Sequence, residues 1–103
     1  MEKINTLIND IQKFQIESTE QYNRNNEINR EQYFKLVYRL EELKVEDFST
    51  SEKYEYFLRY WNQDVRKVGR FVISDSFKNN YIDLNSFLIL SNDFIGAVSW
   101  LKN

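Results

Sequence analysis

Apolar residues recur every three or four positions at the beginning of the chain, a spacing that places them on one face of an α-helix. The pattern predicts a helix that ends near Glu20. The polar run from Asn23 to Asn26 then predicts a chain reversal, because asparagine tolerates left-handed backbone conformations. The residues expected on the buried face of this helix are Ile4, Leu7, Ile8, Ile11 and Phe14.

A second helix is predicted to begin after Asn29, which can cap it, with Gln32 three positions later to complete a capping box. Phe34 and Tyr38 fall about 100° to 140° around this helix from Tyr33, so they form a second aromatic strip beside the main apolar face. Such a strip needs either a further helix or a partner protein to cover it. The main face is expected to consist of Tyr33, Leu36, Val37, Leu40 and Leu43.

A third helix is predicted to begin near Thr50, where Ser49 to Glu52 offer another capping box and Phe48 can act as its hydrophobic staple. This helix has the most regular apolar periodicity in the chain, so we expect it to be the central core helix. Tyr56 and Tyr60 flank its core face, one turn apart. The expected core face is Tyr54, Phe57, Leu58, Trp61, Val65, Val68 and Val72.

After a loop near residues 74–80, the last segment can be interpreted in two ways. Short apolar runs at 81–84, 87–90 and 94–101 would suit strands, whereas a helix that begins at an Asp83 cap gives one continuous apolar face. The chain has no proline and only two glycines, which favours the helix, since all-β folds need more turn residues. The helical face would contain Leu84, Phe87, Leu88, Phe94, Ile95, Val98 and Leu101.

The predicted fold class is therefore all-α, a compact antiparallel bundle of about four helices that forms a single domain over residues 1–103. The alternative is an α+β fold, with three helices followed by a short β-meander from about residue 70. A 17% aromatic content is more than so small a core should hide, so we expect some exposed rings. No apolar run has the length of a signal peptide or membrane span, so we expect a cytoplasmic protein without membrane contact.

Composition removes most catalytic chemistry. Without histidine or cysteine, the chain lacks the commonest general base, metal ligand and nucleophile. Gly69 and Gly96 cannot form a glycine-rich phosphate cradle. We therefore expect a protein that is not an enzyme and binds no cofactor or metal.

Exposed aromatic rings are enriched at the centres of protein interfaces, so the two aromatic strips are the candidate binding residues. With a net charge of only -2 and mixed charges, the chain resembles the general type of bacterial immunity proteins, antitoxins and phage-encoded inhibitors, without a shared motif. The hypothesis is an inhibitor that sequesters another protein, for example a basic toxin or nuclease. Its interface would comprise Phe34, Tyr38, Tyr56 and Tyr60, with an acidic rim of Glu41, Glu42, Glu46 and Asp47.

Two other functions remain open. The third helix carries a basic group that could contact phosphates while nearby tyrosines stack on bases, as in a small nucleic-acid-associated regulator. The balanced charge of the whole chain weighs against nucleic acid. A self-assembling structural subunit, in the simplest case a homodimer, is the other alternative. The basic group consists of Arg59, Arg66, Lys67 and Arg70.

Overall fold

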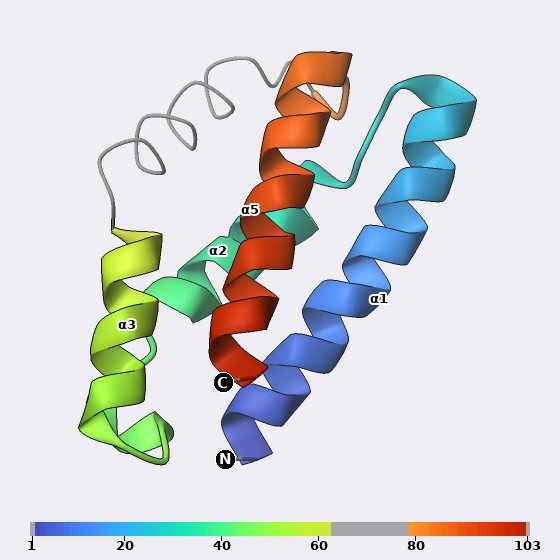
Figure 1. The fold of residues 1–103 in the computed structure, drawn as a ribbon. Helices are drawn as coiled ribbons and strands as arrows, with labels where there is room; N and C mark the ends of the chain where they lie inside the picture. Colours follow the sequence, from blue (N-terminus) through green and yellow to red (C-terminus); the bar gives the residue numbers. More distant parts are fainter. Residues whose placement is uncertain (1, 63–78, 103) are drawn as a thin grey trace.

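The computed structural model describes residues 2–62 and 79–102, which form helices joined by short loops (Figure 1). This part of the chain contains no β-strand, and its one pairing of extended segments is an isolated antiparallel bridge between Glu27 and Tyr81. The all-α prediction is confirmed, and the β-meander alternative is wrong for residues 79–102. The elements are α1 (Glu2–Asn25), α2 (Arg30–Glu41), the 3₁₀ helix η1 (Val45–Asp47), α3 (Ser51–Trp61) and α5 (Leu84–Lys102).

Helix α5 lies between α1 and α3 and runs antiparallel to both, while α2 crosses behind them (Figure 1). An ion pair of 2.7 Å between Arg39 of α2 and Asp10 of α1 ties the crossing helix to the first one. The expectation that the third helix is the central one was wrong, because α5 occupies that place. A helix at the edge of a bundle buries one narrow apolar face, so its apolar residues recur with a clear period. A helix with neighbours on two sides has a wider apolar face, and its period is less distinct.

The core takes side chains from all four of these helices and from the connections between them. Phe94 lies at its centre, with its ring edge-to-face against Phe14 at 5.7 Å and against Tyr33 at 5.6 Å between centroids. The apolar faces expected for the first two helices are buried throughout, so those predictions are confirmed. The fully buried large side chains are Trp61, Phe14, Phe57, Phe94, Leu7, Ile11, Ile28, Leu40, Ile82 and Leu90.

Helix α1 continues to Asn25, beyond the predicted end near Glu20. The extra turn places the Tyr22 ring parallel to that of Phe87, with centroids 4.3 Å apart, and this contact supports a helical end made of poor helix formers. The reversal occurs at Asn26, which has the left-handed φ of 57° that the asparagine run was expected to supply. The carbonyl of Asn26 then accepts a hydrogen bond from the Ile82 N–H at 3.0 Å, which brings the segment before α2 beside the segment before α5.

The helix starts follow the predicted caps closely. The Asn29 side chain accepts a hydrogen bond from the Gln32 N–H at 3.0 Å, and the Asp83 carboxylate accepts one from the Ser86 N–H at 2.8 Å. In α3 the cap is Thr50, one residue after the Ser49 position of the predicted capping box. Phe48 packs against this helix start, with its ring 5.4 Å from that of Tyr54 between centroids, but with Thr50 as the cap it lies one position before the predicted staple position.

The Asp83 cap leads to a pH prediction. Donation by the Ser86 backbone N–H, and then by its hydroxyl, lowers the pKa of Asp83. A carboxyl group whose pKa is lower in the folded state stabilises the fold above its unfolded pKa of about 4, and this contribution is lost as the pH falls through the folded value. We expect Asp83→Asn, which can cap but cannot titrate, to lose less stability in acid than the wild type does. Thermal unfolding from neutral pH to pH 2 tests this, and parallel curves for the two proteins would contradict it.

The apolar face predicted for α5 was only partly correct. Phe87, Phe94, Val98 and Leu101 are buried, but the other expected core residues of this helix, Leu84, Leu88 and Ile95, are exposed. Their places in the core are taken by Leu90, Ala97, Ser86 and Asp93. In α3, Phe57 and Trp61 are buried as expected, but Leu58 is exposed. The other expected core residues Val65, Val68 and Val72 lie outside the described residues.

By length and composition, α5 is also apolar enough to cross a membrane, with 19 residues and a mean hydropathy of 1.2, which the sequence analysis did not anticipate. Of its apolar stretch, 44% is buried inside the protein. Its packing between α1 and α3 in a compact globule favours a helix of a globular protein over a membrane span.

Candidate protein-binding surface

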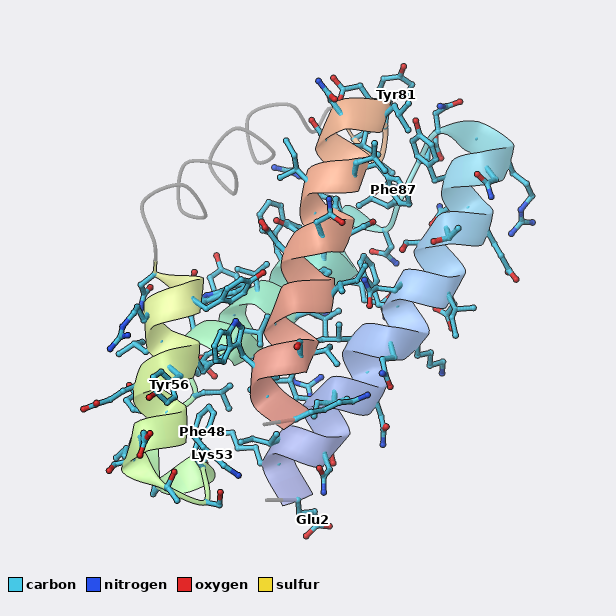
Figure 2. All side chains as sticks on the ribbon, in the orientation of Figure 1. Glu2, Phe48, Lys53, Tyr56, Tyr81 and Phe87 are labelled. Carbon is cyan, nitrogen blue, oxygen red and sulfur yellow. The ribbon has the colours of Figure 1, made fainter. Side chains whose placement is uncertain are left out.

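An exposed aromatic pair lies where α3 meets the C-terminal half of α5. The rings of Tyr56 and Trp100 are 6.0 Å apart between centroids, and the two residues are 42% and 36% exposed. They line a hollow of about 440 Å³, together with Thr50, Glu52 and Lys53. Figure 2 shows Tyr56 and Lys53 on α3, with Phe48 close to the same end of the helix. We call the set Tyr56, Trp100, Thr50, Glu52 and Lys53 the aromatic hollow.

Tyr56 is held in place by charged neighbours on its own helix. Its hydroxyl donates a hydrogen bond to Oε1 of Glu52 at 3.0 Å, and the guanidinium of Arg59 lies 5.6 Å from the ring centroid. The hydrogen bond and the negative charge of Glu52 raise the pKa of Tyr56 above its usual value. The phenol is therefore neutral at physiological pH. A ring fixed on both sides loses little rotamer entropy when a partner covers it.

Tyr60, which the sequence placed in the same strip, is engaged in helix packing. Its hydroxyl donates to the backbone carbonyl of Asp93 at 3.2 Å, and its ring centroid lies 6.3 Å from that of Trp100. The end of the ring lies directly over Gly96, where a Cβ atom would collide with it. Tyr60 therefore packs between α3 and α5 beside Trp100. The aromatic residues of this region that remain open to a partner are Tyr56 and Trp100.

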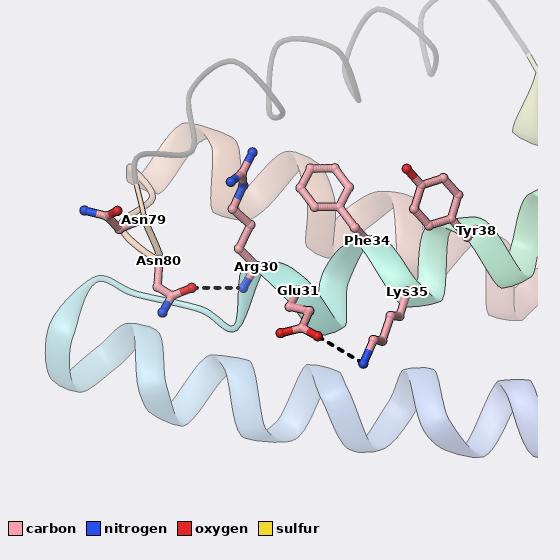
Figure 3. A pocket seen from close by; sticks show the side chains of 7 residues that line it. All are labelled: Arg30, Glu31, Phe34, Lys35, Tyr38, Asn79 and Asn80. Carbon is pink, nitrogen blue, oxygen red and sulfur yellow. Dashed lines mark hydrogen bonds and ion pairs between the residues drawn. The ribbon is translucent and has the colours of Figure 1, made fainter.

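The other aromatic strip lies on α2, beside a second and shallower hollow. In Figure 3, Phe34 and Tyr38 point to the same side of α2. Phe34 is half-buried under the guanidinium of Arg30, 5.3 Å from the ring centroid, whereas Tyr38 is 62% exposed. This hollow, of about 730 Å³, shares no lining residue with the aromatic hollow: it is lined by Arg30, Glu31, Phe34, Lys35, Tyr38, Asn79 and Asn80.

The four residues of the expected acidic rim differ in exposure and in role. Glu41, Glu42 and Glu46 are exposed, as a steering charge would need to be. Asp47 has a structural role, because its Oδ2 accepts hydrogen bonds from the Lys44 N–H at 2.9 Å and from the Lys3 ammonium at 3.3 Å. The donation by the Lys44 backbone is the main cause that lowers the pKa of Asp47. This carboxylate closes η1 and links it to α1.

Of the basic group proposed for nucleic acid, only Arg59 falls within the described residues, where its guanidinium stacks on Tyr56. Arg66, Lys67 and Arg70 lie outside them. Within residues 2–62 and 79–102, no three acidic side chains gather closely enough to hold a metal ion.

Sequence reasoning missed Trp100. The residue lies near the end of a segment whose buried face was assigned incorrectly, so nothing marked it as facing α3. No protein-family model matches this chain, and no curated protein or solved structure is significantly similar to it. The aromatic hollow itself is therefore the main indication of function.

Proposed function

We propose that this protein is a small, non-catalytic protein-binding module that sequesters and inhibits another protein, in the manner of immunity proteins, antitoxins or phage-encoded inhibitors. The observation that carries the proposal is the exposed Tyr56–Trp100 pair. Tyrosine, tryptophan and arginine are the residues most enriched at interface hot spots, and Arg59 lies beside the pair.

The geometry favours a protein as the ligand over a small molecule. Pockets for small molecules usually enclose about 70–90% of the ligand surface. Here the two rings that line the hollow are themselves more than a third exposed, so a small ligand would remain largely in water. A protein surface that lies across both helices would instead remove the rings and the hollow from solvent together.

The exposed acidic side chains suit a partner with a basic surface. The hollow itself is lined by one charge of each sign, Glu52 and Lys53, whereas Glu41, Glu42 and Glu46 are exposed carboxylates outside its lining. Opposite charges steer two proteins together and raise the association rate, an effect that salt reduces. We therefore propose a basic toxin or nuclease as the type of target.

Affinity capture from an extract of the native host, followed by measurement with the purified partner, tests this function. We expect the protein to reduce the partner's own activity at stoichiometric amounts. We expect Tyr56→Ala and Trp100→Ala each to weaken the affinity by about tenfold or more. Ile16→Ala is the matched control, because Ile16 is 66% exposed on α1 and should leave the affinity unchanged.

Two outcomes would contradict the proposal. Full affinity in folded Tyr56→Ala and Trp100→Ala proteins would remove the aromatic hollow from the interface. Capture that disappears after nuclease treatment of the extract would instead favour a nucleic-acid-associated regulator, in which the Arg59–Tyr56 stack contacts nucleic acid.

A further inference from the structure

A small cavity lies at the end of the molecule where the first turns of α1 and α3 meet the last turn of α5. Its volume is about 150 Å³, and its floor consists of Ile4 and Ile8 of α1 and Leu101 of α5, each no more than 6% exposed. Figure 2 shows Phe48 and Lys53, which also line it, at the beginning of α3. We call this space the terminal cavity.

The apolar lining of the terminal cavity is held in place by the fold. Ile4, Ile8 and Leu101 belong to the hydrophobic core. The Phe48 ring is fixed from α3, since its centroid lies 5.7 Å from that of Phe57. An apolar cavity of roughly this size, lined by leucine, isoleucine and phenylalanine, holds a molecule of benzene. The terminal cavity therefore suits a short alkyl chain or a single ring, with about six carbons.

The charged residues of the terminal cavity are all basic. Lys53 and Lys102 line it, and neither ammonium forms an ion pair within the part of the chain that the structure describes. The two larger hollows differ, because Glu52 lines the aromatic hollow beside Lys53 and Glu31 lines the hollow on α2. The described lining of the terminal cavity contains two cations and no acid, so an anion is the complementary ligand.

The helix ends add to this preference. Ile4 lies in the first turn of α1 and Lys53 in the first turn of α3, so two helix N-termini, with their partial positive charges, adjoin the cavity. The C-terminus of α5 has the opposite sign, but Lys102 in its last turn offsets it. Glu2, in the first turn of α1, does not line the cavity.

We propose that the terminal cavity binds a carboxylate that carries an apolar group of about six carbons. The apolar group lies on the floor formed by Ile4, Ile8 and Leu101, and the carboxylate accepts hydrogen bonds from the ammonium groups of Lys53 and Lys102. A free organic acid presents this chemistry, and so does the C-terminal leucine or phenylalanine of another protein.

A titration with sodium hexanoate, followed by two-dimensional ¹⁵N–¹H NMR, tests the site. We expect a Kd on the order of 1–10 mM, with the shifts centred on Ile8, Phe48 and Leu101. Acetate has the charge without the chain, and hexylamine has the chain with the opposite charge, so both should bind at least about tenfold more weakly. Octanoate should bind no more tightly than hexanoate, because the cavity is then already filled. The titration uses the protein alone, so its outcome does not depend on the proposed function.

Two variants test the role of the lysines. Lys53→Met and Lys102→Met keep an apolar stem but remove the charge, so each should weaken hexanoate binding by about three- to tenfold. Lys35→Met is the control, because Lys35 lies on α2, outside the lining of the cavity, and should leave the affinity unchanged.

The source of the carboxylate is distinguished with the peptide acetyl-Gly-Gly-Leu. Binding at least about tenfold tighter than that of hexanoate, and lost in the C-terminal amide, would assign the cavity to the C-terminus of a protein. Tighter binding of hexanoate would assign it to a free acid. No shifts with either ligand at about 50 mM would overturn the proposal, and so would wild-type affinity in both lysine variants. Shifts centred on the exposed residues Leu84, Leu88 and Ile95 would overturn it too, because they would show unspecific association with apolar surface.

Discussion

Truncation of Phe94 to alanine is expected to lower the free energy of unfolding by about 3–5 kcal/mol. The side chain is 99% buried, and its ring packs edge-to-face against both Phe14 of α1 and Tyr33 of α2. Alanine would remove both aromatic contacts and leave a cavity at the point where α1, α2 and α5 meet. A domain of this size commonly has only about 5–15 kcal/mol of stability, so the variant should be partly unfolded at physiological temperature.

Urea denaturation followed by far-UV circular dichroism measures this loss. Ile16→Ala removes an aliphatic side chain from an exposed position and should change the stability by less than about 0.5 kcal/mol, so it serves as the control. A Phe94→Ala protein that loses less than about 1 kcal/mol would show that the centre of the core lies elsewhere. An equal loss in both variants would mean that the burial of Phe94 does not determine the difference.

Features set by nearby residues could be predicted from the sequence. The caps at Asn29 and Asp83 depend on a side chain and a backbone N–H three positions later, so their pattern is visible in a few letters. The buried faces of α1 and α2 could be predicted because the buried apolar residues of each helix recur every three or four positions.

The orientation of α5 could not be predicted in the same way. Apolar residues of α5 occur on several sides of the helix. The sequence does not show which of them face α1 and α3 and which remain exposed to solvent. Leu88 and Leu90 are the same residue type two positions apart, yet Leu88 is exposed and Leu90 is buried. The packing of three other helices determines that choice, and the same packing leaves Leu84, Leu88 and Ile95 exposed.

The residues of the candidate site also fall into two groups, those whose position follows from one helix and those whose position depends on how two helices pack. Tyr56 was predicted because its position beside the core face follows from α3 alone. Trp100 and the packing role of Tyr60 depend on how α3 and α5 meet, which no local pattern records. Asp47 was grouped with the acidic rim, although it accepts a hydrogen bond from the Lys44 N–H three positions earlier. Only its contact with Lys3, 44 positions away, lies beyond any local pattern.

Gly96 provides the second test, and it probes the contact that holds the aromatic hollow together. A Cβ atom at this position would overlap the hydroxyl end of the Tyr60 ring. In a helix, alanine is normally more stable than glycine by about 0.8–1.0 kcal/mol. Here we expect Gly96→Ala to cost about 1–3 kcal/mol instead, because the ring must move and its hydrogen bond to the Asp93 carbonyl is strained or lost.

The effect of Gly96→Ala should change sign when Tyr60 is absent. In a Tyr60→Ala background the space over Gly96 is empty, so the alanine keeps only its helix preference and should stabilise the protein by up to about 1 kcal/mol. A double-mutant cycle in urea, with Gly96→Ala measured in both backgrounds, gives the coupling between the two positions. If Gly96→Ala stabilises the protein with Tyr60 present, the ring leaves its place without penalty, and α3 is not fixed to α5 through this contact. A sign reversal would show that a glycine in α5 and a tyrosine in α3 together set the spacing at which Trp100 reaches Tyr56.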